Sequence, residues 1–221
     1  MNWIRVISEM KKHISISILE GIRIGEETVL KTVGCKSLGG SSPSPSAKTK
    51  VMTLKEATAE LHSKAEKMEF NQRMFRGELS PLEYGNYLTQ QLVIFLEIEC
   101  RGVLPNENLK RSEVIRQDID ELELSELKPL ESSRQYALHL MNITDDELKA
   151  HIYLNYLAIM FGGQMMKSKV PGSGKVYEFE GDMRELIGSV RAIQNDEMAD
   201  EVNKGFQYII NILDELQKNA G

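Results

Sequence analysis

The chain has 221 residues, a mass of 25.1 kDa and 41% hydrophobic residues, which is enough to bury one core and argues against a second full domain. The net charge of −6 is unevenly spread, because residues 1–50 carry eight Lys/Arg against four Asp/Glu and residues 51–221 therefore carry 19 against 29. This acidic body argues against nucleic acid as a partner. No apolar run is long enough for a membrane span, so we expect no membrane anchor.

Residues 1–50 are predicted to lie outside the folded core. The stretch "SLGGSSPSPSAKTK" (37–50) has no apolar period and is typical of a flexible linker. The segment before it has three candidate interpretations, a leader, a fusion remnant and a short partner-binding segment. Two cysteines, Cys35 and Cys100, lack CxxC spacing and favour a reducing, cytoplasmic setting. Organelle targeting by residues 1–36 is the alternative, which four acidic residues disfavour: Glu9, Glu20, Glu26 and Glu27.

Residues 51–221 are predicted to form one all-α domain of six to eight helices. Three helix starts carry capping boxes, "TLKE" at Thr53, "SPLE" at Ser80 and "TDDE" at Thr144, and Pro81 suits a first helical position. Alternation with a period of two is nearly absent, whereas apolar residues recur at helical spacing, as in Leu54, Ala57, Leu61, Ala65 and Met68. Breaks are expected at 102–108, 126–131 and 170–175.

Common catalytic motifs are missing. "PGSGK" (171–175) resembles a phosphate loop only in part, because Val176 stands where Ser or Thr is needed, and neither the upstream glycine nor a preceding strand is present. The sequence also lacks HExxH, GxSxG and any Glu-x-x-His, which removes zinc-protease, hydrolase and di-iron bundle signatures.

His62 is the most informative histidine. It lies beside the apolar stripe of the helix "TLKEATAELHSKAEKMEF", and Glu66 follows four residues later on the same face. A carboxylate one turn away can fix the orientation of a metal-binding imidazole. The alternative is an ordinary His–Glu pair at the boundary of a helix surface.

Gly162 and Gly163 stand together within the helix-forming run "YLAIMFGGQMMKSK" (156–169). Each Gly in a helix interior costs about 1 kcal/mol relative to Ala, so the pair costs about 2 kcal/mol and should have another use. A close backbone approach to a ligand, a helix bend and a tight helix crossing are the three candidates.

Three stretches of this sequence resemble the heme oxygenases. "LKEATAELHSKAE" (54–66) is similar to their proximal-helix motif, and "YLNYLAIMFGGQMMK" (153–167) is similar to their distal-helix segment. "NKGFQYIINILDEL" (203–216) resembles the last core helix of the family. The resemblance covers about residues 52–218. It implies a single-domain helical bundle with heme sandwiched between the proximal helix and a kinked distal helix.

The resemblance assigns the iron contacts and the distal surface. His62 matches the axial iron ligand, and Glu66 matches the residue that positions the other ring nitrogen. Gly162 and Gly163 match the distal glycines, whose missing Cβ atoms allow the backbone to approach the macrocycle.

Further positions match groups that hold the rest of the heme. Lys55 and the hydroxyl of Tyr153 match propionate partners, and Arg184 and Arg191 would add guanidinium groups. Phe206 matches an apolar heme contact. For Lys55 and the two arginines alone, a solvated helix face is the competing interpretation.

The distal motif departs from the family pattern. Where relatives carry Gly-Asp followed by Leu-Ser, this chain has Ala158, Ile159, Met160 and Phe161, and Asn155 replaces a frequent Arg. The missing aspartate normally orders the water that delivers protons. We expect another polar group or a backbone carbonyl to order that water, the alternatives being slow or altered turnover and heme binding without turnover.

The resemblance implies an oxidoreductase that opens heme to biliverdin and releases Fe²⁺ and CO, with heme as both substrate and cofactor. The reaction uses O2 and electrons from a separate protein, a ferredoxin or a flavoprotein reductase, and a bilin reductase is a candidate downstream partner in bilin biosynthesis. Two other functions compete with this one, a heme-binding protein without turnover and a cofactor-free helical interaction protein whose Met residues fill the core.

Overall fold

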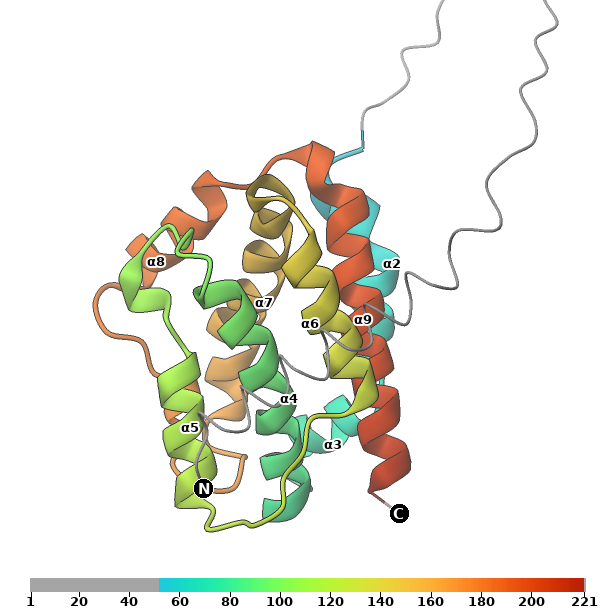
Figure 1. The fold of residues 1–221 in the computed structure, drawn as a ribbon, viewed down its shortest axis with the longest axis vertical. Coiled ribbons are helices and arrows are strands. Elements are labelled where there is room, and N and C mark those ends of the chain that lie inside the picture. Colours follow the sequence, from blue (N-terminus) through green and yellow to red (C-terminus); the bar gives the residue numbers. More distant parts are fainter. Residues whose placement is uncertain (1–51, 221) are drawn as a thin grey trace, which may run out of the picture. The chain divides into compact units, whose positions relative to one another are not determined.

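The computed structural model describes residues 52–220, so the predicted leader and linker lie outside the described residues. Eight α-helices make up most of this part of the chain, and it contains no strand (Figure 1). They are α2 (Leu54–Glu66), α3 (Glu69–Arg76), α4 (Pro81–Glu99), α5 (Ser112–Glu121), α6 (Glu131–Asn142), α7 (Asp145–Met166), α8 (Met183–Ala192) and α9 (Ala199–Asn219). Three short 3-10 turns separate some of them, at Glu107–Leu109, Lys175–Tyr177 and Asp196–Met198. The prediction of an all-α domain with six to eight helices is confirmed.

The capping boxes begin α2, α4 and α7 as the sequence predicts. In each, the hydroxyl of Thr53, Ser80 or Thr144 accepts the N3 backbone N–H, while the N3 glutamate accepts the backbone N–H of the cap residue. Pro81 opens α4 at a position whose N–H needs no helical partner. These local interactions fix where three of the longest elements start.

The core gathers around α9, which packs against α2, α3, α4, α6 and α7. Figure 1 shows α9 running beside α2, with α4, α6 and α7 in the middle of the bundle. One apolar cluster joins α2, α7 and α9, and its buried members are Leu54, Ala65, Ala150, Leu154, Met198, Val202, Phe206 and Ile210. Helix α9 therefore holds the predicted proximal helix α2 and the predicted distal helix α7 on one scaffold.

The loop that partly resembles a phosphate loop is held by hydrogen bonds to a carboxylate of α5. The backbone N–H groups of Lys175 and Val176 donate to the two carboxylate oxygens of Asp118 in α5, at 3.0 and 2.8 Å. Asp118 is buried, and Gly174 within the loop adopts a positive φ of 64°. The two backbone N–H groups therefore already bind a carboxylate of the protein itself. This agrees with the incomplete phosphate-loop motif in the sequence.

Within residues 52–220, no helix has both the length and the apolar character required to cross a bilayer. The longest two, α7 and α9, have 22 and 21 residues. The charged residues of α7 lie between Asp145 and Lys149, and those of α9 are spread from Asp200 to Lys218.

Candidate functional site

His62 lies on the part of α2 that borders solvent. Its side chain is 57% exposed, and its ring meets the ring of Phe206 in α9 edge to face, with the centroids 5.5 Å apart. The Nε2 atom of His62 lies 3.6 Å from Oε1 of Glu66, one turn along the helix. The imidazole is thus supported by an aromatic edge and a carboxylate, while one side remains free for a ligand.

Lys55 shares this face of α2. It precedes His62 by seven residues, which is about two helical turns, so both side chains project in nearly the same direction. Lys55 and His62 are exposed, whereas Leu54 and Ala65 on the adjacent stripe are buried against α9. Lys55, the predicted propionate partner, and His62, the predicted iron ligand, therefore lie on the same exposed face of α2.

Tyr153 and Phe206 belong to the cluster that joins the two helices. Phe206 is buried on α9, and Tyr153 of α7 packs against the same cluster with part of its surface exposed. Leu61, the residue before His62, packs there as well. Tertiary packing therefore brings His62, Phe206 and Tyr153 into one region from three helices.

The two glycines of α7 face different surroundings. A Cβ on Gly163 would lie 2.2 Å from Cδ1 of Tyr177, closer than real Cβ atoms come to a neighbour. A Cβ on Gly162 would meet only the end of Met166, at 3.9 Å. A glycine is therefore required at position 163 by the packing of α7 against Tyr177. Gly162 leaves its side of α7 open to an approaching ligand.

The contact with Tyr177 is completed by the next residue. The side-chain amide of Gln164 donates to the carbonyl oxygen of Tyr177 at 2.9 Å, and Tyr177 is buried. The sequence analysis missed Tyr177, because nothing in its local pattern connects it with a helix that ends eleven residues earlier.

Two large apolar side chains flank the open glycine. Phe161 is 50% exposed and Met165 is 60% exposed, although most of the apolar residues of α7 are buried. The four-residue spacing places them on one face of the helix. The sequence offered a signal for this pair, the apolar i, i+4 positions on either side of the double glycine, but gave no reason to expect exposure.

The predicted arginines lie on α8, which packs against α7. The guanidinium carbon of Arg191 lies 5.7 Å from the centroid of the Phe161 ring, a cation–π contact at the open part of α7. Arg184 precedes it by two turns in the first turn of α8, and both side chains are exposed. Arg191 therefore lies beside Phe161, the residue before Gly162.

Ile159, which the sequence resemblance aligns with the distal aspartate, is buried. Asn155, one turn earlier, is also buried, and its amide nitrogen donates to the hydroxyl of Tyr136 at 3.0 Å and to the carbonyl of His151 at 2.8 Å. The amide nitrogen of Asn155 is therefore already engaged within the protein. The apolar side chain of Ile159 offers no carboxylate that could order water.

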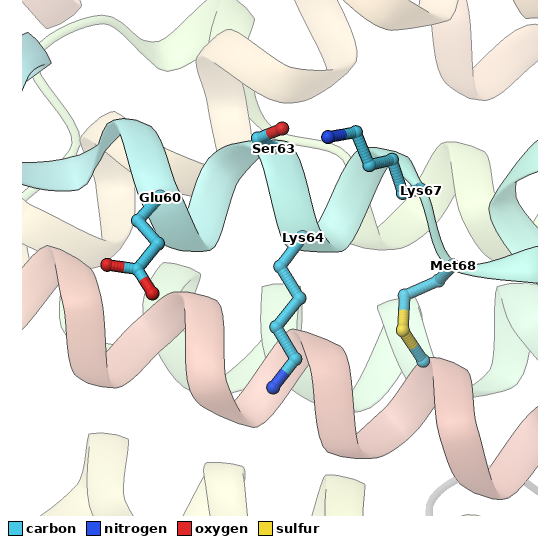
Figure 2. Close-up of a pocket in the computed structure, with 5 residues that line it drawn as sticks. All are labelled: Glu60, Ser63, Lys64, Lys67 and Met68. Carbon is cyan, nitrogen blue, oxygen red and sulfur yellow. The ribbon is translucent and has the colours of Figure 1, made fainter.

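A surface depression on α2 lies away from these residues. It is lined by Glu60, Ser63, Lys64, Lys67 and Met68 (Figure 2). At 100° per residue, Glu60 and Lys64 project from the side of α2 roughly opposite His62. None of the predicted heme residues contributes to this depression, and we assign it no role in the candidate site.

The sequence profile of the heme oxygenases matches residues 49–213. Among solved structures, heme oxygenase-1 of the cyanobacterium Synechocystis in complex with heme is 22% identical, with a TM-score of 0.67, and the match covers 75% of this chain and 91% of that chain. The heme oxygenase of Leptospira interrogans is 21% identical, with a TM-score of 0.65 and coverage of 74% and 100%. Heme oxygenase-2 of Synechocystis with heme and NO is 20% identical, with a TM-score of 0.65 and coverage of 75% and 84%.

At these identities the solved structures establish the fold, and a search of curated proteins finds no match. The family profile spans three quarters of the sequence, including the proximal-helix and distal-helix motifs. The chain belongs to the heme oxygenase family.

Proposed function

We propose that this protein is a heme oxygenase that opens the heme ring to biliverdin and releases Fe²⁺ and CO. The observation that carries the proposal is the open side of Gly162, flanked by the exposed apolar side chains of Phe161 and Met165. A flat apolar ligand fits such a surface, because it needs close backbone approach and covers apolar groups that otherwise face water. Family membership supports heme as that ligand.

His62 supplies the iron ligand in this proposal, and Glu66 fixes the orientation of its ring. Because more than half of the His62 side chain is exposed, the ring can turn about its Cβ–Cγ bond so that one nitrogen faces the iron and the other faces Glu66. The edge of Phe206 limits how far the ring can tilt and adds an apolar contact for the macrocycle.

The heme propionates are assigned to the charged groups at the rim of the site. Lys55 lies on the same face of α2 as His62, and Arg191 lies over Phe161 on the distal side. Arg184 and the hydroxyl of Tyr153 complete the set proposed from the sequence. Guanidinium and ammonium donors suit carboxylates, and these exposed side chains are free to rearrange around them.

Proton supply must work without a carboxylate at position 159. We assign it to water ordered by another polar group or by a backbone carbonyl on the distal side. Heme held in this site supplies the iron chemistry, and O2 and electrons come from outside the chain. The proposed donor is a ferredoxin or a flavoprotein reductase, with a bilin reductase as the candidate consumer of the product and the cytoplasm as the proposed location.

The buried apolar Ile159 is the observation that favours a second function, heme binding without turnover. In that case the site retains His62 and the apolar surface but cannot deliver protons fast enough for ring opening. The two functions use the same proposed site, so only turnover distinguishes them.

The test is a hemin titration of the purified protein, followed by ascorbate or a ferredoxin system in air with catalase present to remove free peroxide. Loss of the Soret band with growth of a biliverdin band supports ring opening, and chromatography of the product gives the isomer. A stable Soret complex without product would instead support heme binding alone. If no complex formed, both functions would be wrong.

A matched pair of variants ties the result to the site. His62→Ala should abolish the Soret complex or shift its band, because it removes the proposed iron ligand. Lys64→Ala lies on the other side of α2 and should leave binding unchanged. Equal loss in both variants would contradict the assignment of His62.

A further inference from the structure

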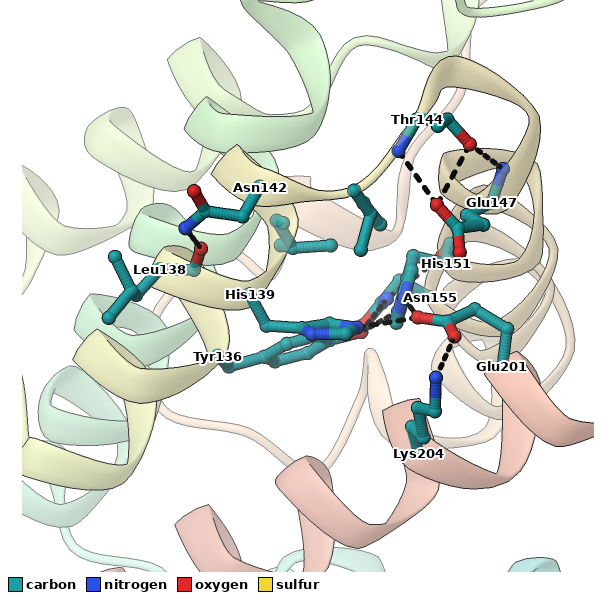
Figure 3. Close-up of polar contacts among 12 residues, drawn as sticks. Tyr136, Leu138, His139, Asn142, Thr144, Glu147, His151, Asn155, Glu201 and Lys204 are labelled. Carbon is teal, nitrogen blue, oxygen red and sulfur yellow. Dashed lines mark hydrogen bonds and ion pairs between the residues drawn. The ribbon is translucent and has the colours of Figure 1, made fainter. Parts of the chain in front are cut away.

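Two histidines and a glutamate from three different helices meet in the interior of the bundle, apart from the candidate heme site. Nε2 of His139 in α6 lies 2.5 Å from Oε1 of Glu201 in α9, and Nε2 of His151 in α7 lies 3.0 Å from the same oxygen. The three potential ligand atoms all lie within 4.8 Å of one another. Figure 3 shows these side chains converging from α6, α7 and α9.

The ring of His151 is held in place through its other nitrogen. The hydroxyl of Tyr136 lies 2.8 Å from Nδ1 of His151, and the amide of Asn155 donates to that hydroxyl at 3.0 Å. His151 is completely buried, and Gly205 of α9 leaves room for it, since a Cβ there would lie 3.1 Å from Nδ1. Metal-binding histidines commonly have such a partner on the second nitrogen, which fixes the ring orientation.

The charges suit a cation at this point. The carboxylate of Glu201 is nearly buried, and its second oxygen accepts from the ammonium of Lys204 at 2.7 Å. Lys204 is 57% exposed, so it can turn into solvent and leave this oxygen for another cation.

We propose that His139, His151 and Glu201 form a binding site for a divalent transition metal of the zinc class, distinct from the heme iron. Two imidazole nitrogens and one carboxylate oxygen are a ligand set that Zn²⁺ accepts, with water or the second Glu201 oxygen as the fourth ligand. Ca²⁺ and Mg²⁺ prefer sites made of oxygen alone. On metal binding each imidazole stays neutral, because its proton is carried by Nδ1 while Nε2 gives its lone pair to the metal, and Nδ1–H of His151 then donates to the Tyr136 hydroxyl.

The geometry needs little adjustment for metal binding. Ligand atoms about 2.0 to 2.2 Å from Zn²⁺ in a tetrahedral site lie about 3.3 Å apart, so each Nε2 would move less than about 1 Å away from Oε1. The His139 side chain is 18% exposed and gives the cluster an edge that solvent reaches. The rings of Tyr136 and Tyr208 stack 4.9 Å apart beside it and form an apolar wall.

The site is located where α6, α7 and α9 meet, so its expected effect is to clamp these helices together. Metal bound only by the folded state raises the stability of that state. The inference does not rest on the proposed heme chemistry, because none of the three ligands belongs to the heme-binding set.

The experiment uses the full chain without a histidine tag, freed of metal by a chelator and without hemin. We expect it to retain one equivalent of Zn²⁺ after gel filtration and to unfold at a higher temperature with Zn²⁺ than without. Co²⁺ should give the visible absorption of a four- or five-coordinate ion with nitrogen ligands. Absence of stoichiometric binding would overturn the proposal.

Single substitutions test whether Zn²⁺ binds at the three proposed ligands. His139→Gln keeps a hydrogen-bond donor for Glu201 and should lower Zn²⁺ affinity at least about tenfold, and Tyr136→Phe should weaken it about 10- to 100-fold by freeing the His151 ring. Asp200→Asn, which removes an exposed carboxylate next to Glu201 in the sequence, is the matched control and should bind Zn²⁺ like the unaltered protein. Unchanged binding in His139→Gln, with folding verified by circular dichroism, would show that the metal binds elsewhere and would overturn the proposal.

Discussion

Gly163 and Tyr177 fit together so closely that a single methyl group on the glycine would overlap the aromatic ring. The ideal Cβ position on Gly163 lies 2.2 Å from Cδ1 and 3.0 Å from Cε1 of Tyr177. The ring is buried, and Gln164 holds the Tyr177 carbonyl. This contact explains one glycine of the pair as a packing requirement and leaves the other for the ligand side.

The glycine pair gives a test in which neighbouring substitutions have opposite effects on stability. Gly163→Ala should lower the free energy of unfolding by about 1 to 3 kcal/mol, because Tyr177 must move. Gly162→Ala should raise it by up to about 1 kcal/mol, because Ala is the better helix former and only Met166 lies nearby. Urea unfolding followed by circular dichroism measures both, and a larger loss for Gly162→Ala would contradict the assignment.

Phe161→Ser should separate heme binding from folding. The side chain is 50% exposed and contacts Arg191, so its replacement should lower the free energy of unfolding by no more than about 1.5 kcal/mol. Removing an apolar group that heme would cover should weaken hemin binding about five- to tenfold, measured by Soret titration. Leu82→Ser, at a residue 53% exposed on α4, is the matched control, and an equal loss there would show that the effect is not local.

The free energy of unfolding should depend on pH through the ionisation of Glu83. The hydrogen bond from Arg73, with an Nη1 to Oε1 distance of 2.7 Å, is the main cause that lowers the pKa of Glu83 from 4.5 to about 2. A folded pKa below the unfolded one means that the stabilisation is present above pH 4.5 and is lost as the pH falls towards about 2.

Glu83→Gln isolates this effect, because Gln can still complete the capping box with Ser80 but cannot form the ion pair. At neutral pH the variant should be about 0.5 to 1 kcal/mol less stable than the unaltered protein. The difference should shrink as the pH falls from 5 towards 2, measured by urea unfolding at each pH. A difference independent of pH would contradict a role for the ionised carboxylate.

Asp118 should control the order of the loop at 170–177. Asp118→Asn leaves only one acceptor oxygen for the backbone N–H groups of Lys175 and Val176, so it should cost about 1 to 3 kcal/mol. Hydrogen exchange of those two amides should become faster, as followed by mass spectrometry. Asp120→Asn, an exposed neighbour on α5, is the control and should leave their exchange unchanged.

The sequence by itself determined the class of fold and three of the eight helix starts in the part of the chain that the structure describes. The capping boxes at Thr53, Ser80 and Thr144 and the helical spacing of apolar residues are local signals, because they depend on residues three or four positions apart. The same locality made His62 and Glu66 recognisable as a pair, and the structure places them one turn apart, with Phe206 against the ring.

Only the tertiary structure decided which neighbours these residues have. Gly162 and Gly163 are equivalent in the sequence, and they differ because Tyr177 returns to one side of α7. His151 meets Glu201 across 50 positions, and Val176 meets Asp118 across 58. Such contacts arise from the packing of whole helices around α9, and no short stretch of sequence records which helix faces will meet.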